Sequence, residues 1–362
     1  MKNRNTLKIL MPILSFGRAG GMRVLSQLAN HWNIKGCDVT FVAFHESEDP
    51  YYPVNVKVIW IDNSGKEMNN NTSTYNAQNS GFKRMYALYM FLKKYSIEYD
   101  IVLANSNNST WPVWLGSKST NYYYIQAYEV EFSDGKNIKA LLKRFTAWLT
   151  YFLPLHKVVN AEVYKNYKNI KCKLVIPPGL DLNIYYPKKI LENYNNEFIV
   201  GCIGRKAEWK GSNDVGEAVK ILRSKGYKVK LKVAFESIKY TEHELVKPDG
   251  DENLADYYRS LDVLIAPGHI QLGAVHYPVI EAMACKVPVI TTGYYPATIE
   301  NSFLVPIKRP DVIADTLVDI IGNYVSAIIK AEIAYTMISQ FDWKVVSAKF
   351  LDIFNDELRR RK

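Results

Sequence analysis

The stretch PGHIQLGAVHYPVIEAMACKVPVITT, residues 267–292, decides the fold of this chain. Two short apolar runs, residues 261–266 and 287–291, have the β-branched composition typical of parallel strands that are covered on both faces. Between them, Pro278 stands where a helix can begin without losing a hydrogen bond. The stretch therefore predicts the end of a buried strand, a loop, a helix and a second buried strand, as in α/β proteins.

The predicted helix would start at the carboxyl end of a parallel strand. Free backbone N–H groups and the positive end of the helix dipole then face the crevice where open α/β sheets bind ligands, and a diphosphate would fit there. Glu281, which we expect in the first turn of this helix, can accept hydrogen bonds from sugar or ribose hydroxyls. The alternative is that Glu281 only complements the helix dipole.

Composition and charge limit the classes of protein. The chain has 362 residues, of which 48% are hydrophobic, enough for two domains. The net charge of +10 permits attraction to nucleic acid, anionic lipid or phosphorylated substrates without selecting one of them. Because the basic residues are dispersed and no nucleic-acid-binding module is recognised, we expect no nucleic-acid partner.

Cysteine usage and the N-terminus indicate a cytoplasmic protein. The four cysteines lie far apart and beside apolar runs, so we predict reduced core thiols. The apolar stretch near the N-terminus is too short to cross a membrane and leads into a glycine loop. We therefore expect no signal peptide and no transmembrane helix.

Apolar runs and amphipathic segments alternate in two series along the chain. A βαβ opening over residues 7–43 begins the first series, and a strand at residues 199–203 begins the second. The predicted parts are a first domain over residues 1–183, a second domain over residues 184–340, and a long amphipathic helix over residues 341–362.

Two loops have the composition of ligand-binding loops. GRKAEWKG, residues 204–211, follows a buried strand and places Arg205 and Lys210 at the carboxyl edge of the second sheet, where two cations can grip a diphosphate. Near the N-terminus, Gly20 and Gly21 lie between a strand and a helix, where glycine lets the backbone approach a ligand closely. This second pattern matches neither GxGxxG nor a P-loop, and the alternative is a tight turn without a ligand.

Five motifs, in this order, together resemble retaining glycosyltransferases of the GT-B fold, specifically glycosyltransferase family 4: the GG loop, GRKAEWKG, NLADYYRSLDVLIAPG, YPVIEAMACKVPVITT and the late FDW helix. The resemblance implies an α/β protein with two Rossmann-like domains facing across a cleft and a C-terminal helix crossing back to the first domain. It also implies that Arg205 and Lys210 hold the donor diphosphate and Glu281 the donor ribose. By the same resemblance, further donor-binding residues are Gly211, Ala274, Val275, His276 and Tyr277.

Two positions depart from the pattern of that family. The first glutamate of its usual pair would fall on Gly273, and His276 replaces a residue that is usually small. The family commonly has a histidine after the last strand of the first domain, where this chain has YIQAYE. There Glu129 is a candidate for orienting or deprotonating the acceptor, whereas Gln126 can only hydrogen-bond. The alternative for Glu129 is a structural carboxylate that caps a nearby loop.

The QxYE pattern and the missing glutamate resemble a branch that contains rhamnosyltransferases of bacterial surface polysaccharides. This resemblance implies dTDP-L-rhamnose as donor, since losing a carboxylate that binds sugar hydroxyls suits a deoxyhexose, and a glycan or lipid-linked acceptor. A non-catalytic protein that binds nucleotide sugar or glycan is the alternative.

No metal or other cofactor is expected. Enzymes resembling this family generally need no metal, and the polar setting of Asp249-Gly250-Asp251 predicts a turn before a helix rather than a metal-binding DxD. His269 and His276 have no carboxylate or thiolate neighbours at zinc-ligand spacing.

Residues 136–157 combine basic and large apolar side chains, as interfacial helices do. The favoured interpretation is an ordinary helix whose apolar face packs on the first domain. The alternative is peripheral docking on the inner membrane leaflet, aided by the basic residues 359–362.

Overall fold

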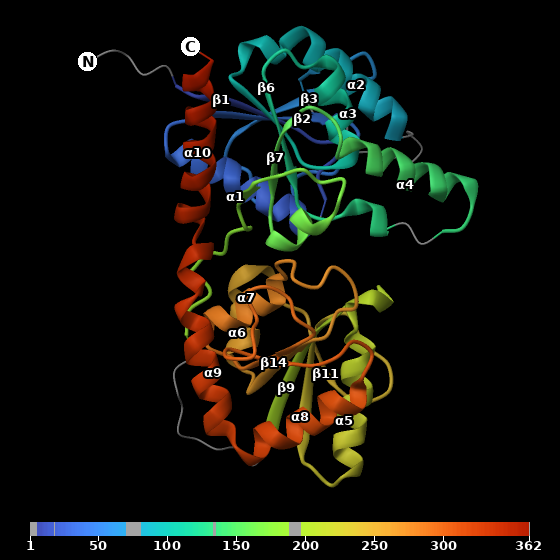
Figure 1. Cartoon of the computed structure of the whole chain (residues 1–362), viewed down its shortest axis with the longest axis vertical. Helices are drawn as coiled ribbons and strands as arrows, with labels where there is room; N and C mark the ends of the chain where they lie inside the picture. The colour runs from blue at the N-terminus through green and yellow to red at the C-terminus, as the bar shows by residue number, and fades with distance from the viewer. Residues whose placement is uncertain (1–5, 18, 70–80, 133–134, 188–196, 362) are drawn as a thin grey trace. The chain divides into compact units, whose positions relative to one another are not determined.

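The computed structural model of the protein describes residues 6–17, 19–69, 81–132, 135–187 and 197–361 (Figure 1). Contacts divide the chain into two units, each described separately below. Unit 1 comprises Met1–Gly179 and Trp343–Lys362, and unit 2 comprises Leu180–Asp342. The first unit boundary therefore lies after residue 179, where the sequence predicted residue 183. The second lies after residue 342, where the sequence predicted residue 340.

Unit 1 is built on an eight-stranded sheet with the order β4-β3-β2-β1-β5-β6-β7-β8. Neighbouring strands run parallel, except β3 and β4. Ile9, Leu10 and Met11 of β1 are completely buried, as expected of a strand covered on both faces. The strands are β1 (Lys8–Pro12), β2 (Asp38–Phe44), β3 (Lys57–Ile61), β4 (Glu67–Met68), β5 (Ile101–Ala104), β6 (Thr120–Ile125), β7 (His156–Val159) and β8 (Leu174–Val175).

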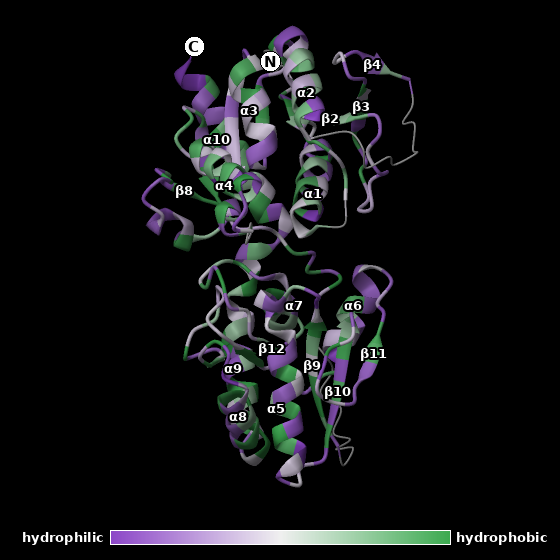
Figure 2. Cartoon of the chain, turned by 90° about the vertical axis from the view of Figure 1, so that its right-hand side faces the viewer, coloured by the Kyte–Doolittle hydropathy of each residue, from purple (hydrophilic) through white to green (hydrophobic). Residues whose placement is uncertain are grey.

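Helices of unit 1 pack around this sheet. Bands of green and purple along α1 in Figure 2 reflect its amphipathic sequence, whose apolar side is buried. The helices are α1 (Gly20–Ile34), α2 (Gly81–Tyr95), α3 (Asn107–Gly116), α4 (Ile138–Thr150) and α10 (Trp343–Arg360), with short 3₁₀ turns η1 (Ser96–Glu98), η2 (Glu129–Phe132) and η3 (Glu162–Asn166).

The last helix, α10, packs on α1. The Trp32 indole N–H donates a hydrogen bond of 3.1 Å to the Ser347 carbonyl oxygen. The Trp32 ring lies edge-on to Phe350 and Phe354, with centroid distances of 5.7 and 5.6 Å, and all three rings are buried. The chain therefore returns to unit 1 after unit 2, which confirms the predicted path of the C-terminal helix.

Unit 2 is built on a six-stranded parallel sheet with the order β11-β10-β9-β12-β13-β14. Its strands are β9 (Phe198–Gly204), β10 (Val229–Phe235), β11 (Glu244–Val246), β12 (Val263–Ala266), β13 (Val289–Thr291) and β14 (Phe303–Leu304). Its helices are α5 (Ser212–Ser224), α6 (Gly250–Arg259), α7 (Tyr277–Ala284), α8 (Pro310–Gly322) and α9 (Tyr324–Thr336), with 3₁₀ turns η4 (Glu208–Lys210) and η5 (Ile338–Phe341). The predicted two α/β units are thus confirmed.

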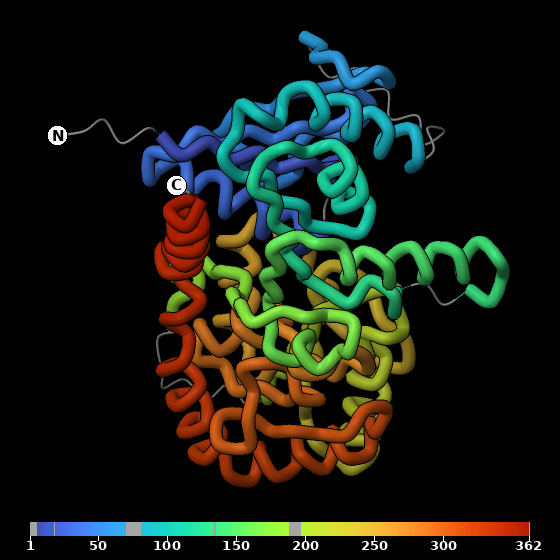
Figure 3. The backbone as a smooth tube through the Cα atoms, turned by 45° about the horizontal axis from the view of Figure 1, so that its top comes forward, coloured from blue at the N-terminus to red at the C-terminus, as the bar shows by residue number. Residues whose placement is uncertain are grey.

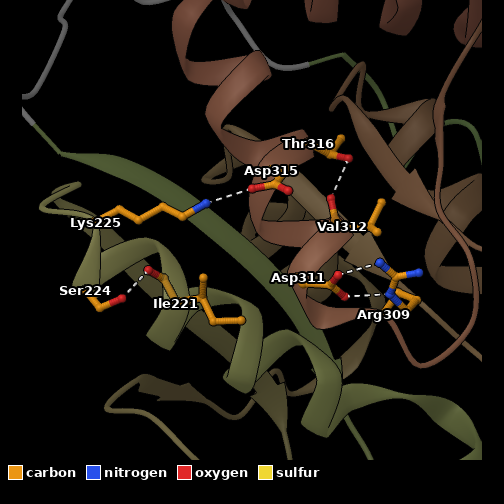
Figure 4. A network of polar contacts seen from close by, with 8 residues as sticks. All are labelled: Ile221, Ser224, Lys225, Arg309, Asp311, Val312, Asp315 and Thr316. Atoms are coloured by element: carbon orange, nitrogen blue, oxygen red, sulfur yellow. Dashed lines mark hydrogen bonds and ion pairs between the residues drawn. The ribbon is translucent and has the colours of Figure 1, made fainter.

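Helices α5 and α8 pack against the same apolar core of unit 2. Val215 and Leu222 of α5 and Leu317 of α8 are completely buried there. On the outside, Lys225 Nζ lies 2.7 Å from Asp315 Oδ1, and Arg309 donates to Asp311 just after the start of α8 (Figure 4). Such exposed ion pairs contribute little to stability, so the buried side chains hold these helices together.

Two further sequence expectations concern helices and thiols. In the ranges that the structure covers, no single helix has both the length and the hydropathy to cross a membrane. The pair of α8 and α9, bent by 102°, meets these criteria only when the two helices are taken together. The four cysteines are free, and Cys37, Cys202 and Cys285 are buried.

Helix α4 corrects the favoured interpretation of residues 136–157. Its inward side consists of Ala140, Ala147 and Thr150, which are buried. Most of its large apolar side chains are exposed instead of packing on unit 1. Small residues allow close packing on the inward side, so the larger ones are left on the outer side.

Candidate functional site

The loop between β9 and α5 passes very close to the loop after β12. Gly211, in the first of these loops, has a φ of +71°, and a Cβ atom there would lie 2.0 Å from the Pro267 carbonyl oxygen. Only glycine fits such an approach. The backbone N–H of His269 donates a hydrogen bond of 2.8 Å to the Trp209 carbonyl oxygen. The structure thus brings together the two segments that the sequence placed at one sheet edge.

Basic side chains gather at this edge of unit 2. Lys210 Nζ lies 3.4 Å from His276 Nε2, and the Arg205 guanidinium lies over the Phe235 ring at 5.2 Å from its centroid. Among the salt bridges of the described residues, none involves Arg205 or Lys210. Burial, and next the charge of Arg205, lowers the pKa of Lys210 to about 8. Within the described residues, neither cation is therefore neutralised by a carboxylate.

His276 is neutral in this setting. Burial, followed by the charges of Lys210 and Arg205, lowers the pKa of His276 well below its usual range. We assign the ring proton to Nδ1, because Nε2 is the atom that can accept a hydrogen bond from Lys210. Nδ1 is buried and has no hydrogen-bond partner among the described residues. A buried donor beside two cations can be satisfied by an anion.

Glu281 lies in the second turn of α7, and the prediction of a first-turn position was wrong. The helix begins at Tyr277, with His276 at the N-cap and no acidic residue in the first turn. Glu281 is only 2% exposed and accepts a hydrogen bond of 2.8 Å from the Tyr258 hydroxyl group. Because the helix dipole acts mainly within the first turn, it does not explain this carboxylate. Ribose binding by Glu281 stays a prediction.

The backbone explains why position 273 is glycine. Gly273 has a φ of +86°, in the left-handed region where a glutamate would be strained. Its N–H donates a hydrogen bond of 2.8 Å to the Gly293 carbonyl oxygen. Next to it, Ala274 is buried and accepts a hydrogen bond from the Tyr295 N–H, while Val275 forms a β-bridge with Tyr295. This segment is therefore shaped by its backbone contacts and leads directly into α7.

In unit 1 the structure brings the glycine loop and Gln126 together. Gly20 and Gly21 are the first residues of α1, and Gln126 directly follows β6. The Gln126 side-chain amide donates a hydrogen bond of 3.3 Å to the Gly21 carbonyl oxygen. A Cβ atom on Gly21 would lie 3.3 Å from Gln126 Oε1, so the absence of a side chain at Gly21 leaves space for this amide.

Glu129 occupies the start of helix α3. Its two carboxylate oxygens lie 3.1 and 3.2 Å from the backbone nitrogen of Asn107, the first residue of α3. The Glu129 N–H in turn donates a hydrogen bond of 3.0 Å to the Tyr151 hydroxyl oxygen. Burial raises the pKa of Glu129 to about 7, while the hydrogen bond from Asn107 acts in the opposite direction. The carboxylate thus caps the start of a helix, where the alternative interpretation had it cap a loop, and it also has the pKa of a general base at neutral pH.

Sequence reasoning missed Asn107 and Tyr151. The polar run NSNNST, residues 105–110, was assigned to no element, although Ser106 and Ser109 form a reciprocal capping box that starts α3. That serine spacing was a usable signal for a helix start. Tyr151 lies within the amphipathic segment 136–157, where nothing distinguished it from the other aromatic residues.

No metal centre is formed within the described ranges, because no three His, Cys, Asp or Glu side chains gather there. His269 does gain a carboxylate neighbour, which corrects the sequence interpretation: its Nε2 lies 2.7 Å from Asp214 Oδ2. The two residues are far apart in the chain and meet because α5 and the loop after β12 share a sheet edge. Asp251 of the DGD segment lies in the first turn of α6, at 3.4 Å from the Tyr185 hydroxyl oxygen.

Part of unit 2 is similar to known glycosyltransferases. Residues 197–323 match the family model described as "Glycosyl transferases group 1". CapM of Staphylococcus aureus, a capsular polysaccharide biosynthesis glycosyltransferase, is 29% identical over 161 residues. That match covers 38% of this chain and 40% of CapM, so the chain spans less than half the length of this relative.

Solved structures share the fold of the whole chain. Sucrose-phosphate synthase from Thermosynechococcus elongatus is 17% identical with a TM-score of 0.76, covering 98% of this chain and 100% of that one. Anabaena HepE in complex with UDP-glucose is 13% identical with a TM-score of 0.69, covering 97% and 100%. WaaG, involved in lipopolysaccharide biosynthesis, is 14% identical with a TM-score of 0.69, covering 96% and 99%. The chain therefore has the two-domain Rossmann-like GT-B fold, and its residues 197–323 are similar to group 1 glycosyltransferases.

Proposed function

We propose that the protein is a retaining glycosyltransferase that moves a sugar from a nucleotide-sugar donor to a glycan or lipid-linked acceptor in bacterial surface polysaccharide synthesis. The observation that carries the proposal is the basic cluster of Arg205, Lys210 and His276 next to the start of α7. The roles of CapM and WaaG in capsular polysaccharide and lipopolysaccharide synthesis support the biological setting.

The basic cluster suits the leaving group of such a reaction. When the bond between sugar and diphosphate breaks, negative charge develops on the diphosphate. Arg205 and protonated Lys210 would stabilise that charge, and the N–H at His276 Nδ1 would donate to a phosphate oxygen. The start of α7 adds the positive end of its dipole. In this arrangement Glu281, a turn further along, would accept hydrogen bonds from the donor ribose.

For the donor sugar we propose L-rhamnose, supplied as dTDP-L-rhamnose. The φ of +86° at Gly273 disfavours a side chain where related enzymes commonly place a carboxylate against the sugar. A sugar with fewer hydroxyl groups needs that carboxylate less. The same missing carboxylate is the observation that favours the second candidate, a non-catalytic protein that binds nucleotide sugar or glycan.

A mass-spectrometric transfer assay with dTDP-L-rhamnose, UDP-glucose and GDP-mannose and a set of glycan and lipid-linked acceptors tests both candidates. UDP-glucose belongs in this set because HepE was solved in complex with it. We expect product with dTDP-L-rhamnose, unchanged by EDTA. Turnover with UDP-glucose or GDP-mannose and none with dTDP-L-rhamnose would reject the rhamnose donor, whereas nucleotide-sugar binding without any product favours the non-catalytic candidate.

The affinity of the free protein for a nucleoside diphosphate should fall as the pH rises above about 8. Lys210 has a pKa of about 8 and attracts phosphate only when protonated, so binding is constant below this pH and weakens above it. Calorimetric titration with dTDP across this pH range measures the effect. The variant Lys210→Arg keeps its charge at these pH values and should bind with a flat profile. A wild-type affinity that does not change between pH 7 and pH 9.5 would contradict the assigned role of Lys210.

Because Lys210 must stay protonated, kcat/KM should fall above about pH 8. If ionised Glu129 accepts the proton of the acceptor hydroxyl, kcat/KM should also have an acid limb that rises with pH through about 7, the pKa of this carboxyl. Glu129→Gln should remove this limb and lower kcat/KM by roughly 10²- to 10⁴-fold at pH 8. The glutamine can still accept a hydrogen bond from the Asn107 N–H, so the cap of α3 is retained. Wild-type kinetics in Glu129→Gln would show that the residue only caps the helix.

A further inference from the structure

Helix α4 turns a row of large apolar side chains outward from unit 1. Figures 1 and 3 show α4 extending away from the rest of unit 1. Its small residues are buried, whereas its large apolar side chains are exposed. The outward residues and their exposed fractions are Ile138 87%, Leu141 59%, Leu142 59%, Phe145 52%, Trp148 38% and, just past the helix end, Phe152 51%. Covering these side chains would remove a substantial apolar area from water, so the row is a binding surface rather than a set of scattered surface residues.

The outward residues form one continuous stripe. Their spacing of three and four positions places them on a single side of the helix, over a length of roughly 20 Å. Phe145 stacks on Trp148 with a centroid distance of 6.1 Å, and Trp148 meets Phe152 edge-on at 4.6 Å. Aromatic rings of this kind are enriched where proteins meet the interface between lipid and water.

Cations flank the stripe on both sides. Lys139 and Lys143 lie along one edge of the apolar arc and Arg144 along the other, by their positions on a helix with 3.6 residues per turn. The helix sequence IKALLKRFTAWLT contains no acidic residue. Long basic side chains at such positions reach the phosphate groups of lipids while the apolar side chains enter the acyl region.

We propose that α4 docks unit 1 on the surface of a bilayer that contains anionic phospholipids. A protein partner would need carboxylates matched to three particular cations, whereas an anionic lipid surface complements them at any position. The stripe lies on one side of a single helix and is rich in large side chains, as an interfacial helix requires. This inference goes beyond the proposed function and does not depend on transfer activity.

Flotation of the full chain with vesicles tests the inference. We expect binding to equimolar phosphatidylcholine and phosphatidylglycerol, and much weaker binding to phosphatidylcholine alone. Reversing the charges at Lys139, Lys143 and Arg144 to glutamate should weaken binding by about a hundredfold or more, since each cation near an anionic surface contributes about fivefold. Replacing Leu141, Phe145 and Trp148 by serine should abolish binding at the same protein concentration.

Controls separate docking from misfolding and from self-association. In the control variant, Lys220, Lys228 and Lys349, which are exposed and lie outside α4, are replaced by glutamate. This variant has the same net charge as the charge-reversed α4 variant and should keep at least a third of the wild-type affinity. Both α4 variants should unfold at the wild-type temperature, because their altered side chains point outward. The inference is overturned if the wild type does not float with anionic vesicles. It is also overturned if the control variant loses as much binding as the charge-reversed α4 variant. A third contradicting result would be that α4 substitutions dissociate an oligomer of the chain without changing flotation.

Discussion

Lys210→Ala should lower the rate of sugar transfer by roughly 10²- to 10³-fold, the effect expected when one preorganised group that stabilises developing charge is removed. Lys210 is largely buried beside His276, so water cannot readily replace its charge at the leaving diphosphate. Arg205→Ala should have a similar effect, because arginine can hold two phosphate oxygens at once. Initial rates at saturating donor, measured by product mass, give the result.

Lys206→Ala is the matched control for Lys210→Ala. Lys206 belongs to the same loop and carries the same charge, but its side chain is exposed. Removing a solvated charge near the site changes its overall attraction for an anion only slightly, since salt screens it. We therefore expect rates within about threefold of wild type. Equal losses in Lys206→Ala and Lys210→Ala would mean that the loop attracts the donor only by its net charge, and the assigned contact would be wrong.

Gly211→Ala should destabilise unit 2 by about 2 to 5 kcal/mol and greatly weaken nucleotide binding. Part of the cost is the left-handed backbone, about 1 to 2 kcal/mol for a residue with a Cβ atom. The rest arises because that Cβ would meet the Pro267 carbonyl oxygen at 2.0 Å, so one of the two loops must move. Lys210 is the adjacent residue and would move with it. Urea-induced unfolding and calorimetric titration with dTDP measure the two effects.

Gly226→Ala isolates the conformational part of this cost. Gly226 has a φ of +88°, similar to that of Gly211, but no atom lies within 4 Å of its ideal Cβ position. We expect a loss of about 1 kcal/mol and unchanged nucleotide affinity. If Gly211→Ala proves no more costly than Gly226→Ala, the close contact with the loop after β12 does not determine the geometry of the site.

Elements with strong local patterns were predictable from the sequence. Buried parallel strands such as β9 and β12 appear as short β-branched runs, and α5 and α7 are the next α-helices along the chain. The placement of Arg205 and Lys210 at the carboxyl edge of the sheet could therefore be deduced. The return of α10 to unit 1 came from the family resemblance, and the buried contacts of Trp32 then confirmed it.

Contacts between distant segments were not predictable in this way. The pairing of His269 with Asp214, and the burial of Glu281 against Tyr258, depend on how loops and helices meet at the sheet edge. The exposed stripe of α4 was misassigned for a related reason: periodicity shows that one side of a helix is apolar, but not whether that side faces the core. The helix boundary at Tyr277 decided the turn in which Glu281 lies, and boundaries are poorly encoded by local sequence.

A crystal structure of the protein with bound dTDP is the most direct test of the donor site. We expect the diphosphate to lie at the start of α7, within hydrogen-bond distance of the Lys210 ammonium group, the Arg205 guanidinium and Nδ1 of His276. A nucleotide bound elsewhere, for example at the Gly20–Gly21 loop of unit 1, with no phosphate near Lys210, would contradict the assignment of unit 2 as the donor-binding domain.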